Sequence, residues 1–134
     1  MPWCICKSGG REIKPGRKVM KLIIAVIQPT KLRAVHEELS KIGVERLTIS
    51  DAQEFASSED RVRITRGEAT GATMFRKINL EIAVNEDYVE RTIEAIEKAA
   101  KTGKLGNDGD GKVFVLPLAE AIQFSPEKRG KEAI

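Results

Sequence analysis

The glycine-rich segment at residues 102–112, TGKLGNDGDGK, is the part of this chain best suited to hold an anion. Glycines recur within it at short spacing, and their lack of a Cβ lets backbone N–H groups converge on an anion. Lys112 adds a point charge that a phosphate would favour. A helix cap followed by a flexible turn explains the same composition. The candidate binding residues in this segment are Thr102, Gly103, Gly106, Gly109, Asp110, Gly111 and Lys112.

Other kinds of chemistry lack the residues that they need. The segment has neither the Lys-Ser or Lys-Thr pair of a Walker loop nor the GxGxxG spacing of a dinucleotide site. An EF-hand register using Gly111 would place Pro117 where a bidentate glutamate is required. His36, the single histidine, has no nucleophile or paired carboxylate at catalytic spacing. We therefore expect a binding protein that signals, and not an enzyme.

Two similar halves of the chain must position this segment. In the first half, residues 21–28 predict a strand, Thr30 is a possible helix cap, and residues 44–53 predict a second strand. The helix between them ends at Gly43, which suits a left-handed cap. Its apolar residues recur at spacings of three and four: Leu32, Val35, Leu39 and Ile42.

The second half repeats the order. Residues 78–84 alternate apolar and polar side chains, Asn85 can cap the next helix, and residues 113–118 supply the last strand, with Pro117 favouring a sheet edge. The buried stripe of this helix is Val89, Ile93, Ile96 and Ala100. The order β-α-β-β-α-β predicts an α+β, ferredoxin-like fold, with a four-stranded antiparallel sheet and both helices on one face. Apolar strand residues such as Ile23, Ala25, Ile27 and Val115 then favour an oligomer that buries the open face.

A connection of 21 residues, 54–74, joins the two halves where a hairpin needs only about two to five. It contains four acids and three arginines, so it is too polar to pack as core. Both a disordered insertion and a loop that contacts a partner fit this composition.

Length and composition fit one globular domain. The chain has 134 residues and only 4% aromatic side chains, so its core must be aliphatic. Its net charge is +3, but residues 1–19 carry five basic residues and one acid, or +4, which leaves 3 − 4 = −1 for residues 20–134. A slightly acidic domain whose central strands lack stacking aromatics argues against nucleic-acid binding. The longest apolar run, Leu22 to Ile27, is too short to span a membrane, and we expect a cytoplasmic protein.

Residues 1–19 form a basic extension with no apolar periodicity, which we expect to be flexible. Alternatively, Met20 is the true start of the protein. Cys4 and Cys6 lie too close together for an ordinary disulfide. Two thiolates with no third ligand nearby make a poor metal site. Because residues 1–19 lack apolar periodicity, we expect the domain itself to span residues 20–134.

From Met20 onward, the chain resembles the P-II signal-transduction family of nitrogen-regulatory proteins. The resemblance rests on four motifs: KLIIAVIQPTKL near the start, Arg66-Gly67 in the long connection, KINLEI from Lys77, and TGKLG…GDGKVFVLPLAEAI near the end. It implies a homotrimer with nucleotide sites between subunits and with loops that reach a target transporter or enzyme. It also implies that Thr48 and the backbone near Ala83 hold adenine, and that residues 109–112 hold the phosphates.

Departures from the family pattern change what is expected of these sites. Three extra residues lengthen the glycine loop, so that either Gly106 or Gly109 fills the first glycine role. Gln123 and Ser125 replace two arginines that reach the outermost phosphate. The loss of two such contacts weakens triphosphate binding by about two to four powers of ten, so we expect ADP or AMP to bind better than ATP.

The base of the long connection also departs from the family. Ala56-Ser57-Ser58 replaces the Gly-Arg-Gln that brings Mg-ATP and 2-oxoglutarate together, although Lys77 remains. Without the glutamine that anchors the metal, we expect weak 2-oxoglutarate sensing and little role for magnesium. Thr70 stands where enteric members carry a tyrosine that is uridylylated. An alternative function on the same fold is a trimeric metal-tolerance protein, with Cys4, Cys6, His36 and acids of the connection as ligands.

Overall fold

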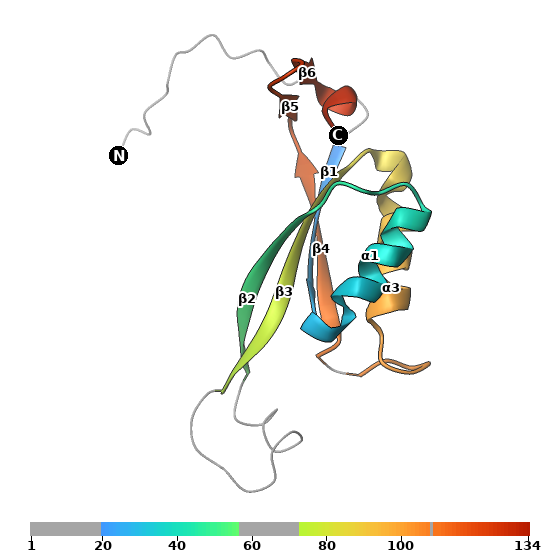
Figure 1. Cartoon of the computed structure of the whole chain (residues 1–134), viewed down its shortest axis with the longest axis vertical. Helices are drawn as coiled ribbons and strands as arrows, with labels where there is room; N and C mark the ends of the chain where they lie inside the picture. The colour runs from blue at the N-terminus through green and yellow to red at the C-terminus, as the bar shows by residue number, and fades with distance from the viewer. Residues whose placement is uncertain (1–19, 57–72, 108) are drawn as a thin grey trace, which may run out of the picture.

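A four-stranded antiparallel sheet covered on one face by two helices makes up the fold (Figure 1). The computed structural model describes residues 20–56, 73–107 and 109–134. The strands are β1 (Met20–Ile27), β2 (Thr48–Ala56), β3 (Thr73–Val84) and β4 (Gly111–Leu118), in the sheet order β2-β3-β1-β4. The helices are α1 (Leu32–Lys41) and α3 (Val89–Ala100), each entered through a 3-10 turn. The predicted ferredoxin-like arrangement is confirmed.

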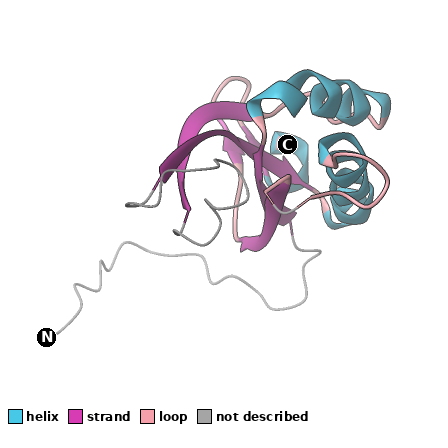
Figure 2. Cartoon of the chain, turned by 90° about the horizontal axis from the view of Figure 1, so that it is seen from below, coloured by secondary structure: helices cyan, strands magenta, loops and turns pink. Residues whose placement is uncertain are grey.

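The core lies between the sheet and the two helices, which occupy the same side of it (Figure 2). Alternate residues of β1 point towards the helices, and Ile23, Ala25 and Ile27 are fully buried there. The intervening residues face the open side, where Leu22 pairs with Leu116 and Ile24 with Phe114. Leu116 is 41% exposed and Phe114 51% exposed, so the open face is apolar. The residues named from the sequence do not form it, because Ile23, Ala25 and Ile27, with Val115 paired to Ile23, lie on the helix side.

β3 is longer than the predicted strand 78–84, and β2 begins at Thr48 instead of residue 44 and ends later than the predicted residue 53. β2 continues to Ala56 and β3 begins at Thr73, so both ends of the predicted 54–74 connection are paired strand. This part of the ribbon extends away from the helices (Figure 1). Exposure alternates along residues 51–55, but each face of this part mixes apolar and polar side chains, so the sequence does not show the apolar–polar alternation of a strand. Residues 57–72 lie outside the described part.

The helix ends differ in part from prediction. Gly43 adopts φ 81°, and Gly43 N and Val44 N donate to the carbonyls of Ser40 and Leu39, which confirms the left-handed cap. Thr30 lies inside the 3-10 turn before α1 and does not cap the helix, because Pro29 starts that turn earlier. Asn85 occupies the capping position before the second turn, but its side chain makes no capping hydrogen bond there.

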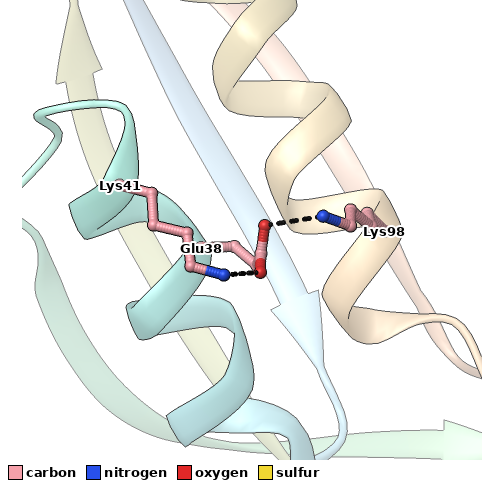
Figure 3. A network of polar contacts seen from close by, with 3 residues as sticks. All are labelled: Glu38, Lys41 and Lys98. Atoms are coloured by element: carbon pink, nitrogen blue, oxygen red, sulfur yellow. Dashed lines mark hydrogen bonds and ion pairs between the residues drawn. The ribbon is translucent and has the colours of Figure 1, made fainter.

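An ion-pair network joins the outer surfaces of the two helices (Figure 3). Glu38 on α1 accepts hydrogen bonds from Lys41 Nζ at 2.5 Å and from Lys98 Nζ on α3 at 3.1 Å. These two lysines lower the pKa of the Glu38 carboxyl below its ordinary value. The network supplements the apolar contact beneath it, where Val35 and Leu39 are fully buried.

The C-terminal segment adds a short two-stranded sheet, β5 (Ile122–Gln123) with β6 (Lys128–Arg129), and a 3-10 turn at Gly130–Ala133. Arg129 bridges this segment internally, because it contacts Glu120 at 3.0 Å and Glu127 at 3.3 Å. No helix in the described part is long and apolar enough to cross a membrane.

Candidate functional site

The glycine-rich loop between α3 and β4 is closed by the side chain of Asp110. Its Oδ2 accepts hydrogen bonds from the backbone N–H groups of Thr102 at 2.8 Å and Asn107 at 2.7 Å, and its Oδ1 accepts one from the Thr102 hydroxyl at 2.6 Å. These bonds, with that of the Thr102 hydroxyl contributing most, lower the pKa of Asp110 from 3.8 to about 2. The carboxylate therefore shapes the loop, and it is charged at neutral pH.

Four glycines of this loop have positive φ, but they do different work. At Gly111, where φ is 150°, an added Cβ would overlap the carbonyl oxygen of Val26 on the neighbouring strand. Gly106 packs closely against the Asp110 carboxylate, because a Cβ there would lie 3.2 Å from Oδ2. Gly103 and Gly109 have open space where a Cβ would be. The loop therefore approaches the backbone of β1 most closely at Gly111.

Within the lengthened loop, Asp110 N donates to the Asn107 carbonyl at 3.1 Å. The Gly109 carbonyl accepts hydrogen bonds from Lys77 Nζ at 2.6 Å and from Gln28 Nε2 at 3.0 Å. Lys77 is 6% exposed, and its Nζ lies 4.0 Å from the Glu54 carboxylate. The structure thus brings Lys77 directly to the glycine loop. Gln28 and Glu54 also belong to this group of contacts, and the sequence did not reveal them.

The remaining site residues follow the open face of the sheet away from this loop. Lys112 pairs with Val26, so its side chain shares that face. Ala83 pairs with Leu22, which is five residues along β1 from Ile27, the partner of Gly111. At about 3.3 Å per residue this is roughly 17 Å. A ligand touching both ends would have to be elongated, as a nucleotide is with its base at one end and its phosphates at the other.

Thr48 and Ala83 lie close together at the far end of this face. Thr48 is directly opposite Glu81, and Ala83 is the next β3 residue on the same face. The ladder between β2 and β3 ends at this Thr48–Glu81 pair, two residues before Ala83. The backbone of Ala83 therefore lies past the paired region on the β2 side.

A pocket of about 510 Å³ lies on the other side of the glycine loop, towards the helices. It is lined by Ile27, Ile96 and Ala100, all buried, and by Gly106 and Asp110 of the loop. The loop therefore separates an apolar pocket beside α3 from the open sheet face.

Several predicted residues cannot be placed. Ser57, Ser58, Arg66 and Gly67 of the long connection lie outside the described residues, as do Cys4 and Cys6 of the N-terminal extension. His36 is exposed on α1. Within residues 20–56, 73–107 and 109–134, no group of three His, Cys, Asp or Glu side chains is arranged to hold a metal ion.

Comparison with known proteins decides the family. The family model described as nitrogen regulatory protein P-II matches residues 20–128. The chain belongs to the P-II family. It is 44% identical to the nitrogen regulatory protein GlnK1 of Methanosarcina mazei, over 86% of this chain and 97% of that protein. It is 38% identical to the P-II protein of Rhodospirillum rubrum, over 86% of this chain and all of that protein.

Solved P-II structures agree with this fold. The GlnK–ATP complex of B. subtilis superposes with a TM-score of 0.70 at 26% identity, covering 87% of this chain and 99% of that one. P-II of Arabidopsis thaliana bound to citrate gives 0.69 at 32% identity, covering 87% and 94%. P-II proteins are signal-transduction regulators in nitrogen control, and this confirms the expectation of a regulator that is not an enzyme.

Proposed function

We propose that this P-II protein binds an adenine nucleotide along the open face of its sheet and that nucleotide binding changes its interaction with a partner protein. The observation that carries the proposal is the glycine loop, which is held in shape by Asp110 and brought against β1 at Gly111. Gly109 to Lys112 would hold the phosphates, and Thr48 with the backbone near Ala83 would hold the base. The GlnK of B. subtilis, which has the same fold, is described in complex with ATP.

The proposed preference is for ADP or AMP over ATP. Gln123 and Ser125 stand where the family pattern has two arginines, and Gln123 Nε2 lies 3.4 Å from the Ser125 carbonyl. Arg129 is a poor substitute, because Glu120 and Glu127 already pair with its guanidinium. Lys128 and Lys131 remain as single point charges, without the forked donor geometry of arginine.

Isothermal titration with AMP, ADP and ATP tests both parts of this proposal. We expect ADP or AMP to bind most tightly, since the contacts to the outermost phosphate are missing. Clearly tightest binding of ATP would refute the preference but leave the site intact. Binding of none of the three would refute the site itself.

We further propose that 2-oxoglutarate is sensed weakly or not at all. The only buried lysine of the described part, Lys77, already donates to the Gly109 carbonyl and faces Glu54. A dicarboxylate would have to displace the first contact and would meet the charge of the second. Titration of 2-oxoglutarate in the presence of Mg-ATP measures this, and micromolar affinity would contradict it.

The proposed working form is a cytoplasmic homotrimer in which each chain covers part of the apolar open face of another. The proposed partner is a transporter or an enzyme, contacted by the connection between β2 and β3. We also retain the proposal that residues 1–19 form an extension separate from the domain of residues 20–134. Pull-down experiments with and without each nucleotide would identify the partner.

A further inference from the structure

Lys77 is the only charged side chain that is buried in the described part of the chain. Gln28 lies beside it just past the end of β1, since the pairing of β1 with β3 ends at Ile27 with Ile78. Both side chains donate to one oxygen, the Gly109 carbonyl, at 2.6 Å and 3.0 Å. A carbonyl oxygen has two lone pairs, so this pair of donors accounts for its full hydrogen-bonding capacity.

These two bonds fix one peptide unit of the glycine loop. The Gly109 carbonyl and the Asp110 N–H belong to the same planar amide, and that N–H donates to the Asn107 carbonyl at 3.1 Å. Since the unit is held at both ends, it cannot rotate without breaking bonds on both sides. It leads directly into Asp110 and Gly111, so its orientation sets the direction of the backbone that would face an anion.

Burying a lysine for this purpose alone would be costly. An exposed loop carbonyl can be satisfied by water, whereas a buried ammonium group loses hydration that Glu54, at 4.0 Å, only partly replaces. A methionine would fill the same volume without that cost. The buried charge therefore suggests a role in the site and not only in stability.

We propose that Lys77 is a positioning residue for the glycine loop, acting on the bound anion through the Gly109 carbonyl and not by contacting the anion. The proposal rests on the nucleotide site proposed above. Gln28 supports the same carbonyl, and Glu54 keeps the Lys77 ammonium in place from the end of β2.

The test compares nucleotide affinities of Lys77→Met with those of the unchanged full-length protein. We expect about a tenfold loss, the scale of one charge-assisted hydrogen bond, and the same factor for AMP, ADP and ATP. Lys77→Arg should recover part of the loss, and Gln28→Leu should give a smaller loss of the same kind. Lys21→Met, at the other end of β1, should leave all three affinities unchanged. A loss that grows from AMP to ATP would show direct phosphate contact and overturn the proposal.

A second readout does not depend on nucleotide. Amide hydrogen exchange at Asp110, followed by NMR in the free protein, should be faster in Lys77→Met and unchanged in Lys21→Met. Unchanged exchange in Lys77→Met would overturn the positioning role, whatever the affinities are. If the unchanged protein binds none of the nucleotides, the proposed function fails, and the exchange rates still decide the role of Lys77.

Discussion

Asp110 is an acid within a segment that is suited to anions, and its hydrogen bonds explain why it is tolerated there. One carboxylate oxygen accepts a hydrogen bond from the Thr102 hydroxyl, and the other accepts from the backbone N–H groups of Thr102 and Asn107, all within the same loop. Its charge is therefore directed into the loop. A carboxylate in this position would repel a phosphate if it were free to turn outward.

The low pKa of Asp110 makes loop stability depend on pH in a defined direction. Because the folded-state value of about 2 lies below the ordinary 3.8, the charged form stabilises the fold above pH 3.8. This contribution is lost as the pH falls from about 4 towards 2. We expect Asp110→Asn to lower the melting temperature at pH 7 and to remove this part of the acid dependence. Thermal unfolding from pH 7 to pH 2 measures both, and parallel curves for the two proteins would contradict the assignment.

Gly111 and Gly103 provide a matched pair of substitutions. Alanine at either position must adopt positive φ, at roughly 1–2 kcal/mol. At Gly111 its Cβ also meets the Val26 carbonyl, whereas at Gly103 it meets nothing within 4 Å. We expect Gly111→Ala to destabilise the protein and weaken nucleotide binding clearly more than Gly103→Ala. Chemical denaturation and titration test this, and equal effects would mean that the strand approach is not tight.

At this scale the sequence predicted the residue types and missed the partners. Glycine spacing and Lys112 marked the loop, because those features are local. Gln28 could not be found, since it lies 81 positions from Gly109 in the chain and meets it only through strand register. The same holds for Glu54, which is 23 positions from Lys77 and faces it only because β2 and β3 pair beyond the predicted strand end.

The helices and strands were predicted well wherever one face is buried. Residues 89–100 form α3 with the predicted apolar stripe, and Gly43 ends α1 as expected. The ends of β2 and β3 were missed because this part of the ribbon is not covered by the helices. Thr30 was assigned a capping role that Pro29 pre-empts, since proline readily begins a helical turn.

The packing of α1 depends on its buried stripe more than on the ion pairs above it. Leu39 is fully buried, and Leu39→Ala should lower the free energy of unfolding by about 2–5 kcal/mol. Glu38→Ala, one position away, removes the network of Figure 3 and should cost much less, with an effect that shrinks in high salt. Urea unfolding at two salt concentrations compares them. A larger effect for Glu38→Ala would mean that the ion pairs dominate.

At the scale of the whole molecule, the open sheet face is an apolar surface that the described part of a single chain does not cover. Leu22, Ile24, Phe114 and Leu116 share this face by register, and the last two are substantially exposed. The order of helices and strands predicted an open sheet face, but the pairing was needed to show which residues form it. Ile23, Ala25 and Ile27 lie under the helices instead.

Assembly can be tested on this face directly. We expect Leu116→Arg to shift the protein from a trimer to a single chain in light scattering, since a buried unpaired charge opposes association. Ala34→Arg, on the exposed side of α1, is the matched control and should leave the mass unchanged. A trimer that survives Leu116→Arg would place the subunit contact elsewhere.

The hydrogen bonds that Gln28 and Lys77 donate to the Gly109 carbonyl also bear on the order of folding events. Those residues come from both halves of the chain, so the loop takes its final shape only after β1, β3 and β4 are aligned. Closing such distant contacts is entropically slow. The hydrogen-bonded shape of the glycine loop should therefore be absent from the folding transition state. Substitutions within the loop should accelerate unfolding and leave the refolding rate almost unchanged.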